Sequence, residues 1–118
     1  MDELILWHNP RCSKSREALA LLREHGMEPR LVDYQRTPPS AAELDHVLVL
    51  LGVEPLQLVR TGETVWVEVG GDPTLDRDAL IAIMVAHPIL IQRPIAISGE
   101  RAVLGRPPER VLDLLPAR

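Results

Sequence analysis

Residues 4–34 read LILWHNPRCSKSREALALLREHGMEPRLVDY, and this stretch decides the fold. Its first four residues form an apolar run of strand length, which ends at the turn-forming residues 8–10. Residues 13–25 then predict a helix with an apolar stripe of alanines and leucines, stopped by a glycine. Residues 31–34 predict a second strand. A strand, a helix and a strand in this order predict a parallel strand pair joined by a right-handed crossover.

The middle of the chain is predicted to be helical. Ser40 to Glu43 form a capping box that opens a helix ending at Leu51, and a short helical segment is expected over residues 55–60. Residues 61–73 favour no single structure, because the strand-forming run Val65–Val69 is bounded by glycines. Thr74 is expected to cap a further helix that ends at His87.

The C-terminal part of the chain returns to strands. Residues 95–98 and 101–104 predict a hairpin around Gly99-Glu100. Pro107-Pro108 is expected to begin a final helix that runs to Leu115, with proline at its first position. The order strand–helix–strand, then helices, then strand–strand–helix predicts an α/β protein whose sheet is covered by helices. The length predicts one domain over residues 1–118.

The composition excludes several classes of protein. The longest apolar run, Ala79–Ala86, has eight residues, whereas a membrane-spanning helix needs about 18 or more. Asp2 and Glu3 replace the basic segment that opens a secretory signal. The single cysteine excludes an internal disulfide framework and a multi-cysteine metal site. These features predict a cytoplasmic protein in a reducing environment.

The charge balance argues against a nucleic-acid partner. The net charge is −4, and two Trp, one Tyr and no Phe cannot build a base-stacking platform. Twelve of the thirteen basic residues are arginines, and Lys14 is the exception. Genomic base composition accounts for this bias most simply, although arginine also binds oxyanions through two parallel hydrogen bonds.

Cys12 is the first candidate for chemistry. It follows a predicted strand and opens a predicted helix, where free backbone N–H groups and the helix dipole favour an anion. Arg11, Lys14 and Arg16 lie beside it in sequence, so we expect its thiol to ionise more readily than a free thiol. The alternative is a small buried hydrophobic residue, which the polar and basic neighbours disfavour.

The spacing Cys12-x-x-Ser15 limits the redox chemistry. A serine hydroxyl cannot form a disulfide, so a dithiol cycle within the chain is excluded. A nucleophilic Cys12 must therefore obtain its resolving thiol from another molecule.

Three arginines and one proline are further candidates. Arg93 precedes Pro94 at the start of a predicted strand, and a proline there indicates an edge strand, a bulge or a cis bond. Arg106 lies next to a predicted helix N-terminus, where a cation is unfavourable unless an anion binds there. Arg93 also fits a solvated loop arginine, and Arg60 fits a helix C-terminus on stability grounds alone.

The histidines do not predict a metal site. His8 and Cys12 are four residues apart, but no second pair has metal-ligand spacing, so no metal is expected. His25 and His87 are predicted to lie at helix C-termini, and His46 on a helix surface.

Three segments of the sequence resemble the glutaredoxin-coupled arsenate reductases and their less characterised relatives. They are residues 8–16, 87–95 and 105–109, and Asp33-Tyr34 and Pro38-Pro39-Ser40 also fit. The resemblance spans Ile5 to about Leu115. It implies a thioredoxin-like fold with a helical insertion between its two halves.

The resemblance also implies an oxidoreductase activity in arsenic detoxification. Cys12 would form a covalent adduct with arsenate, and His8 would match the histidine linked to lowering the cysteine pKa. Arg60, Arg93 and Arg106 would surround the oxyanion, Pro94 would be the cis-proline of the fold, and Ser15 and Arg16 would support the site. Glutathione would attack the adduct as co-substrate and glutaredoxin would resolve the mixed disulfide, with no tightly bound cofactor.

Two other functions remain open from the sequence. The chain could be a glutathione-linked thiol–disulfide enzyme or a redox sensor, which would react without an oxyanion. It could also be a polymerase-binding regulatory module, since the resemblance extends to such a regulator. Regulators of that kind commonly carry a Cys-x-x-Cys switch, which Ser15 rules out here.

Overall fold

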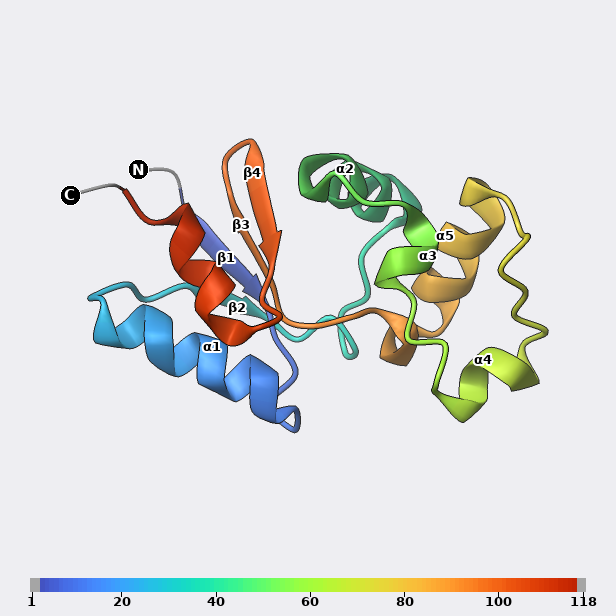
Figure 1. Cartoon of the computed structure of the whole chain (residues 1–118), viewed down its shortest axis with the longest axis horizontal. Helices are drawn as coiled ribbons and strands as arrows, with labels where there is room; N and C mark the ends of the chain where they lie inside the picture. Colours follow the sequence, from blue (N-terminus) through green and yellow to red (C-terminus); the bar gives the residue numbers. More distant parts are fainter. Residues whose placement is uncertain (1–2, 117–118) are drawn as a thin grey trace. The chain divides into compact units, whose positions relative to one another are not determined.

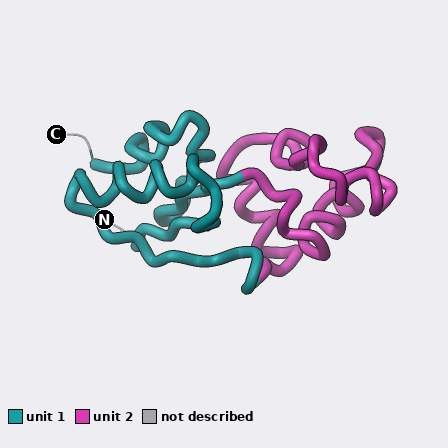
Figure 2. Tube along the Cα trace, turned by 90° about the horizontal axis from the view of Figure 1, so that it is seen from below, with its two compact units in different colours: residues 1–37, 93–118 teal, residues 38–92 magenta. Residues whose placement is uncertain are grey.

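The computed structural model describes residues 3–116, which group into two compact units (Figure 2). The first unit comprises the residues up to Thr37 and those from Arg93 onward, and the second comprises Pro38–Gln92. The first unit holds all four strands of the sheet, and the second is built from helices. A helical insertion between two halves of an α/β fold is therefore confirmed. The prediction of one domain over residues 1–118 stays a prediction, because compactness does not test whether a unit folds alone.

A four-stranded sheet forms the centre of the first unit (Figure 1). Its strands are β1 (Leu4–Trp7), β2 (Arg30–Val32), β3 (Ile95–Ser98) and β4 (Arg101–Leu104), arranged in the order β2-β1-β3-β4. β1 pairs with β2 in parallel and with β3 antiparallel, and β3 and β4 form the expected hairpin. The parallel pairing of β1 and β2 across α1 (Ser13–Glu24) confirms the predicted strand–helix–strand unit.

The core of this unit lies between the sheet and two helices. α1 packs against η2, a 3-10 helix over Pro108–Leu114. Every third or fourth residue of α1 faces this core, as expected for an amphipathic helix. The core consists of buried residues of β1, α1, β3 and η2: Leu4, Leu6, Ala18, Leu19, Leu22, Ala96, Val111 and Leu114.

The second unit contains the inserted helices. They are α2 (Ala41–Leu51), α3 (Pro55–Leu58), α4 (Thr64–Glu68), α5 (Arg77–Ala86) and the 3-10 helix η1 (Pro88–Leu90). The predicted capping box is present, since Ser40 Oγ accepts from Glu43 N–H at 3.1 Å and the Glu43 carboxylate accepts from Ser40 N–H. Asp45 and Arg77 link α2 to α5 through a 2.8 Å ion pair. Of the helices described, none combines the length and apolar character needed to cross a membrane.

The structure decides the segment that the sequence left open and corrects one prediction in the insertion. Residues 64–68 form a helix despite their strand propensity, because the helical turn buries Trp66 while leaving Val67 exposed. The indole of Trp66 packs directly on Gly71, where an added Cβ would clash with the ring. Asp76, and not Thr74, caps α5, because the Asp76 carboxylate accepts from Ala79 N–H at 2.9 Å. Thr74 instead donates to the Asp72 side chain.

The ends of several other elements also differ from the predictions. The second strand ends at Val32, because Asp33 O accepts from two later N–H groups and turns the chain, which leaves Tyr34 fully buried. α3 ends at Leu58, and α1 ends at Glu24. The final helix is 3-10 rather than α-helical, with Pro107 before its first residue.

Candidate active site

The loop between β1 and α1 is closed by two hydrogen bonds that Asn9 accepts. The Asn9 carbonyl accepts from Cys12 N–H at 2.9 Å, and its side-chain oxygen accepts from Arg11 N–H at 3.0 Å. Pro10 lies inside this turn, where its fixed φ angle favours the bend. The turn places Cys12 as the N-cap residue of α1. Sequence reasoning missed Asn9 as a site residue, although an asparagine before a proline is itself a turn signal.

Ser15 and His8 hold this loop from the inside. Ser15 is fully buried, and its Oγ accepts from Asn9 N–H at 3.0 Å and lies 2.5 Å from His8 Nδ1. Burial lowers the pKa of His8, and the positive charges of Arg23 and Arg16 lower it further, against an opposing effect of Asp33. This lowered pKa favours the neutral form of His8. In this structure its contact is with the Ser15 hydroxyl, so it orients the loop rather than adding charge.

The thiol of Cys12 has a lowered pKa. Burial raises the pKa of this half-buried group, but the backbone N–H of Ser15, the Arg93 side chain and the backbone N–H of Lys14 together outweigh burial. The Cys12 side chain makes no regular capping hydrogen bond, yet the N–H groups of the first helical turn are close enough to favour its thiolate. The predicted effect of the helix N-terminus on Cys12 is therefore present.

Arg106 brings a second guanidinium to the sulfur. Its Nη2 lies 4.0 Å from Cys12 Sγ, and its Nε donates to the Arg93 carbonyl at 2.9 Å. Over residues 3–116, Arg106 forms no ion pair with a carboxylate. Its guanidinium is therefore open to an anion beside Cys12.

Gly105 allows Arg106 to reach this position. Its N–H donates to the Pro94 carbonyl at 2.8 Å, and a Cβ added to it would lie 2.7 Å from Pro94 Cγ and 3.0 Å from Val111 Cγ1. Only glycine permits so close an approach. Sequence reasoning did not assign Gly105 a role, and a glycine directly before a candidate arginine was the available signal.

The peptide bond before Pro94 is cis, and so is the bond between Arg106 and Pro107. Pro94 was predicted to mark an edge strand, a bulge or a cis bond, and the cis bond is the one present. Pro94 cannot mark an edge, because the strand it precedes, β3, lies between β1 and β4.

The predicted site residues divide between the two units. The first unit contains Cys12, Arg93 and Arg106 in mutual contact, with His8, Ser15 and Pro94 beside them. Arg16 belongs to the same unit, with its backbone N–H bonded to the Cys12 carbonyl and its Nη1 bonded to the Pro10 carbonyl.

Arg60 belongs to the second unit. Its backbone N–H donates to Leu90 O at 2.7 Å, next to a bridge between Val59 and Ile91. Its guanidinium forms an ion pair with Glu63 at 3.1 Å, and both side chains are about one-quarter exposed. The charge of Arg60 is thus already compensated.

The remaining histidines have structural positions. His25 and His87 lie at the C-terminal ends of α1 and α5, as predicted, and His46 is exposed on α2. Among the residues that the structure describes, no three His, Cys, Asp or Glu side chains are grouped so that they could hold a metal ion.

Similarity to known proteins covers nearly the whole chain. The model of the ArsC family matches residues 7–114. The chain is 46% identical over 112 residues to the uncharacterized protein YfgD of Escherichia coli strain K12, covering 93% of this chain and 94% of that protein. It is 42% identical over 117 residues to an arsenate reductase of Neisseria meningitidis, covering 98% of this chain and all of that one.

A solved structure shows the same architecture. The arsenate reductase from Vibrio cholerae superposes with a TM-score of 0.92 at 44% identity, covering 97% of this chain and 98% of that chain. The four-stranded sheet with its helices is therefore the thioredoxin-like fold that the sequence predicted. With this agreement in sequence and in structure, the chain belongs to the ArsC family.

Proposed function

We propose that this chain is an arsenate reductase in which Cys12 is the nucleophile. The observation that carries the proposal is the contact between Cys12 Sγ and Arg106 Nη2 at 4.0 Å, at a thiol whose pKa is already lowered. A thiolate beside a guanidinium without a carboxylate partner combines a nucleophile with an anion-binding group. Relatives named arsenate reductase match this chain over almost its full length.

The first step is an attack on arsenic. Arg93 and Arg106, together with the N–H groups at the start of α1, neutralise the negative charge of arsenate. The resemblance would add Arg60 as a third ligand, and its guanidinium would then have to exchange Glu63 for the oxyanion. The Cys12 thiolate donates an electron pair to arsenic, an S–As bond forms, and one arsenate oxygen leaves as water after taking up protons.

The second step needs an external thiol, because the sequence contains one cysteine. The thiolate of glutathione attacks Cys12 Sγ, an S–S bond forms and the S–As bond breaks. The electron pair of the broken bond stays on arsenic, which is reduced from As(V) to As(III) and leaves as arsenite. Glutaredoxin then reduces the mixed disulfide between Cys12 and glutathione and regenerates the thiol.

A coupled assay tests the proposal. The mixture contains the protein, arsenate, glutathione, glutaredoxin, glutathione reductase and NADPH, and the matched control is Cys12→Ser. We expect NADPH consumption that requires both arsenate and Cys12. Folded protein with a reactive thiol but no arsenate-dependent consumption would contradict the proposal. NADPH consumption with a disulfide substrate in place of arsenate would then favour a thiol–disulfide enzyme.

A further inference from the structure

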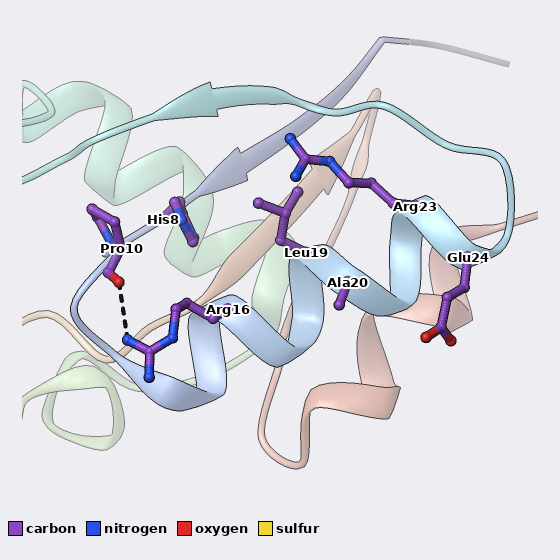
Figure 3. Close-up of a pocket in the computed structure, with 7 residues that line it drawn as sticks. All are labelled: His8, Pro10, Arg16, Leu19, Ala20, Arg23 and Glu24. Atoms are coloured by element: carbon purple, nitrogen blue, oxygen red, sulfur yellow. Dashed lines mark hydrogen bonds between the residues drawn. The ribbon is translucent and has the colours of Figure 1, made fainter.

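A groove of about 670 Å³ runs beside α1 (Figure 3). One end is formed by His8 and Pro10, in the loop that leads to Cys12, and the rest by residues between Arg16 and Glu24 of α1. Its volume falls within the range of about 300–1,000 Å³ that small-molecule sites occupy. The reaction steps described above do not use this groove.

The groove runs along one side of α1, and Cys12 lies at the N-terminal end of this helix. Arg16, Leu19 and Arg23 are spaced by three and four residues, which places them along one stripe of α1. Cys12 precedes this stripe as the N-cap residue, and its carbonyl accepts from Arg16 N–H at 3.0 Å. Arg16 is one turn beyond Cys12, a rise of roughly 6 Å. Leu19 and Ala20 provide an apolar surface in the middle of the groove.

Positive charge is concentrated at the end of the groove next to Cys12. Arg16 is exposed, and its Nη1 donates to the neutral Pro10 carbonyl at 3.0 Å (Figure 3). Within residues 3–116 it has no carboxylate partner. Arg23, farther along, is neutralised by Glu28, with Nε 2.9 and 3.1 Å from the two carboxylate oxygens. Glu24 adds a negative charge at that far end.

We infer that this groove binds one arm of glutathione while the glutathione sulfur is bonded to Cys12. A carboxylate of the tripeptide pairs with Arg16, and the apolar atoms of that arm lie between Arg16 and the sulfur. The lengths agree, because an extended tripeptide spans about 10 Å with its sulfur on the central residue, so each arm reaches about one helical turn, the distance from Cys12 to Arg16. The inference rests on the proposal that glutathione is the reductant, and it names where that reductant binds.

Thiol–disulfide exchange tests the groove without arsenate. The Cys12 thiolate attacks oxidised glutathione, a bond forms between Cys12 Sγ and one glutathione sulfur, and the other glutathione leaves as a thiolate. The comparison substrate is hydroxyethyl disulfide, which undergoes the same exchange but carries no charge. The rate constants are measured for the wild type, Arg16→Gln, Arg16→Lys and the control Arg30→Gln. Arg30 is an exposed arginine of β2, outside the groove, paired with Glu3.

We expect Arg16→Gln to slow exchange with oxidised glutathione about fivefold, as for one exposed charge pair of about 1 kcal/mol. Its rate with hydroxyethyl disulfide should stay within about twofold of the wild type, because in the structure the backbone of Ser15 and Lys14 and the side chain of Arg93, not the charge of Arg16, lower the pKa of Cys12. Arg16→Lys should recover part of the loss, and Arg30→Gln should show none. An equal loss with both disulfides, no loss, or a matching loss in Arg30→Gln would overturn the inference. Since no arsenate is present, the arsenate reductase proposal can fail while this result stands, and the reverse also holds.

Discussion

Arg106 and Arg60 are predicted to bind the same oxyanion, but their surroundings are opposite. Arg106 has no carboxylate partner in the described part of the chain, and its guanidinium contacts the Cys12 sulfur. Arg60 is held by Glu63 on its own unit. An arginine without a carboxylate attracts an anion at full strength, whereas a paired arginine binds one only in competition with its partner. We therefore expect Arg106 to dominate oxyanion binding and Glu63 to weaken the contribution of Arg60.

The largest effect is expected at Arg106. Replacing it with alanine removes a cation from the reacting sulfur, and the loss of one such group typically costs about a hundredfold to a thousandfold in rate. We therefore expect kcat/KM for arsenate to fall by about that factor in Arg106→Ala. Arg106→Lys should recover part of it. Steady-state kinetics with arsenate as the varied substrate measure the change, and a loss below about threefold would show that Arg106 does not act on the oxyanion.

The next largest effect is expected at Gly105, which lets Arg106 reach Cys12. Gly105→Ala places a methyl group 2.7 Å from Pro94 Cγ, so the segment must shift, at a typical cost of about 1–3 kcal/mol in the free energy of unfolding. The kcat/KM for arsenate should fall as well, because Arg106 moves away from Cys12. Gly62→Ala is the matched control, since nothing lies within 4 Å of its added Cβ. Urea unfolding and arsenate kinetics measure both effects, and equal stability of the two variants would contradict the packing argument.

A smaller effect is expected in the pH dependence of Cys12. Arg93 lowers the pKa of the Cys12 thiol by a hydrogen bond and by its charge, so Arg93→Met should raise that pKa. Alkylation by iodoacetamide requires the thiolate, and its rate rises as pH increases through the pKa. The wild-type midpoint should lie below that of a free cysteine, about pH 8.5, and the variant midpoint should be higher. An unchanged midpoint would show that Arg93 does not lower the pKa of the Cys12 thiol.

The smallest effect is expected from releasing Arg60. In Glu63→Gln the guanidinium loses its ion pair, and KM for arsenate should fall about twofold to fivefold, the range of an exposed ion pair of up to about 1 kcal/mol. Asp45→Asn, which breaks the other ion pair of the insertion, is the control and should leave KM unchanged. A rise in KM for Glu63→Gln would show that Glu63 supports Arg60 in binding and does not compete.

Strong local signals made the first unit predictable from sequence. The bounds of β1, β3 and β4 agree with the prediction, because each is a short run of strand-forming residues bounded by turn residues. Residues 64–68 could not be predicted in the same way. Their valines favour a strand, and what decides the helix is the packing of Trp66 on Gly71, a tertiary contact.

The site was predictable only in part for a similar reason. The N-terminal position of Cys12 on a helix follows from local sequence. Its lowered pKa does so only in part, because Arg93, a residue distant in sequence, contributes to it. The bond between His8 and Ser15, the closing of the loop by Asn9 and the pairing of Arg60 with Glu63 depend on side-chain directions that spacing alone does not give. Arg106 reaches Cys12 from 94 residues away along the chain.

Intact-mass measurement tests the nucleophilic role of Cys12 most directly. The wild type and Cys12→Ser are incubated with arsenate and glutathione but without glutaredoxin, so that the mixed disulfide cannot be resolved. We expect the wild type to gain the mass of one glutathione only when arsenate is present, and Cys12→Ser to gain none. A wild type that stays unmodified in the presence of arsenate, or that gains glutathione equally without it, would contradict the account.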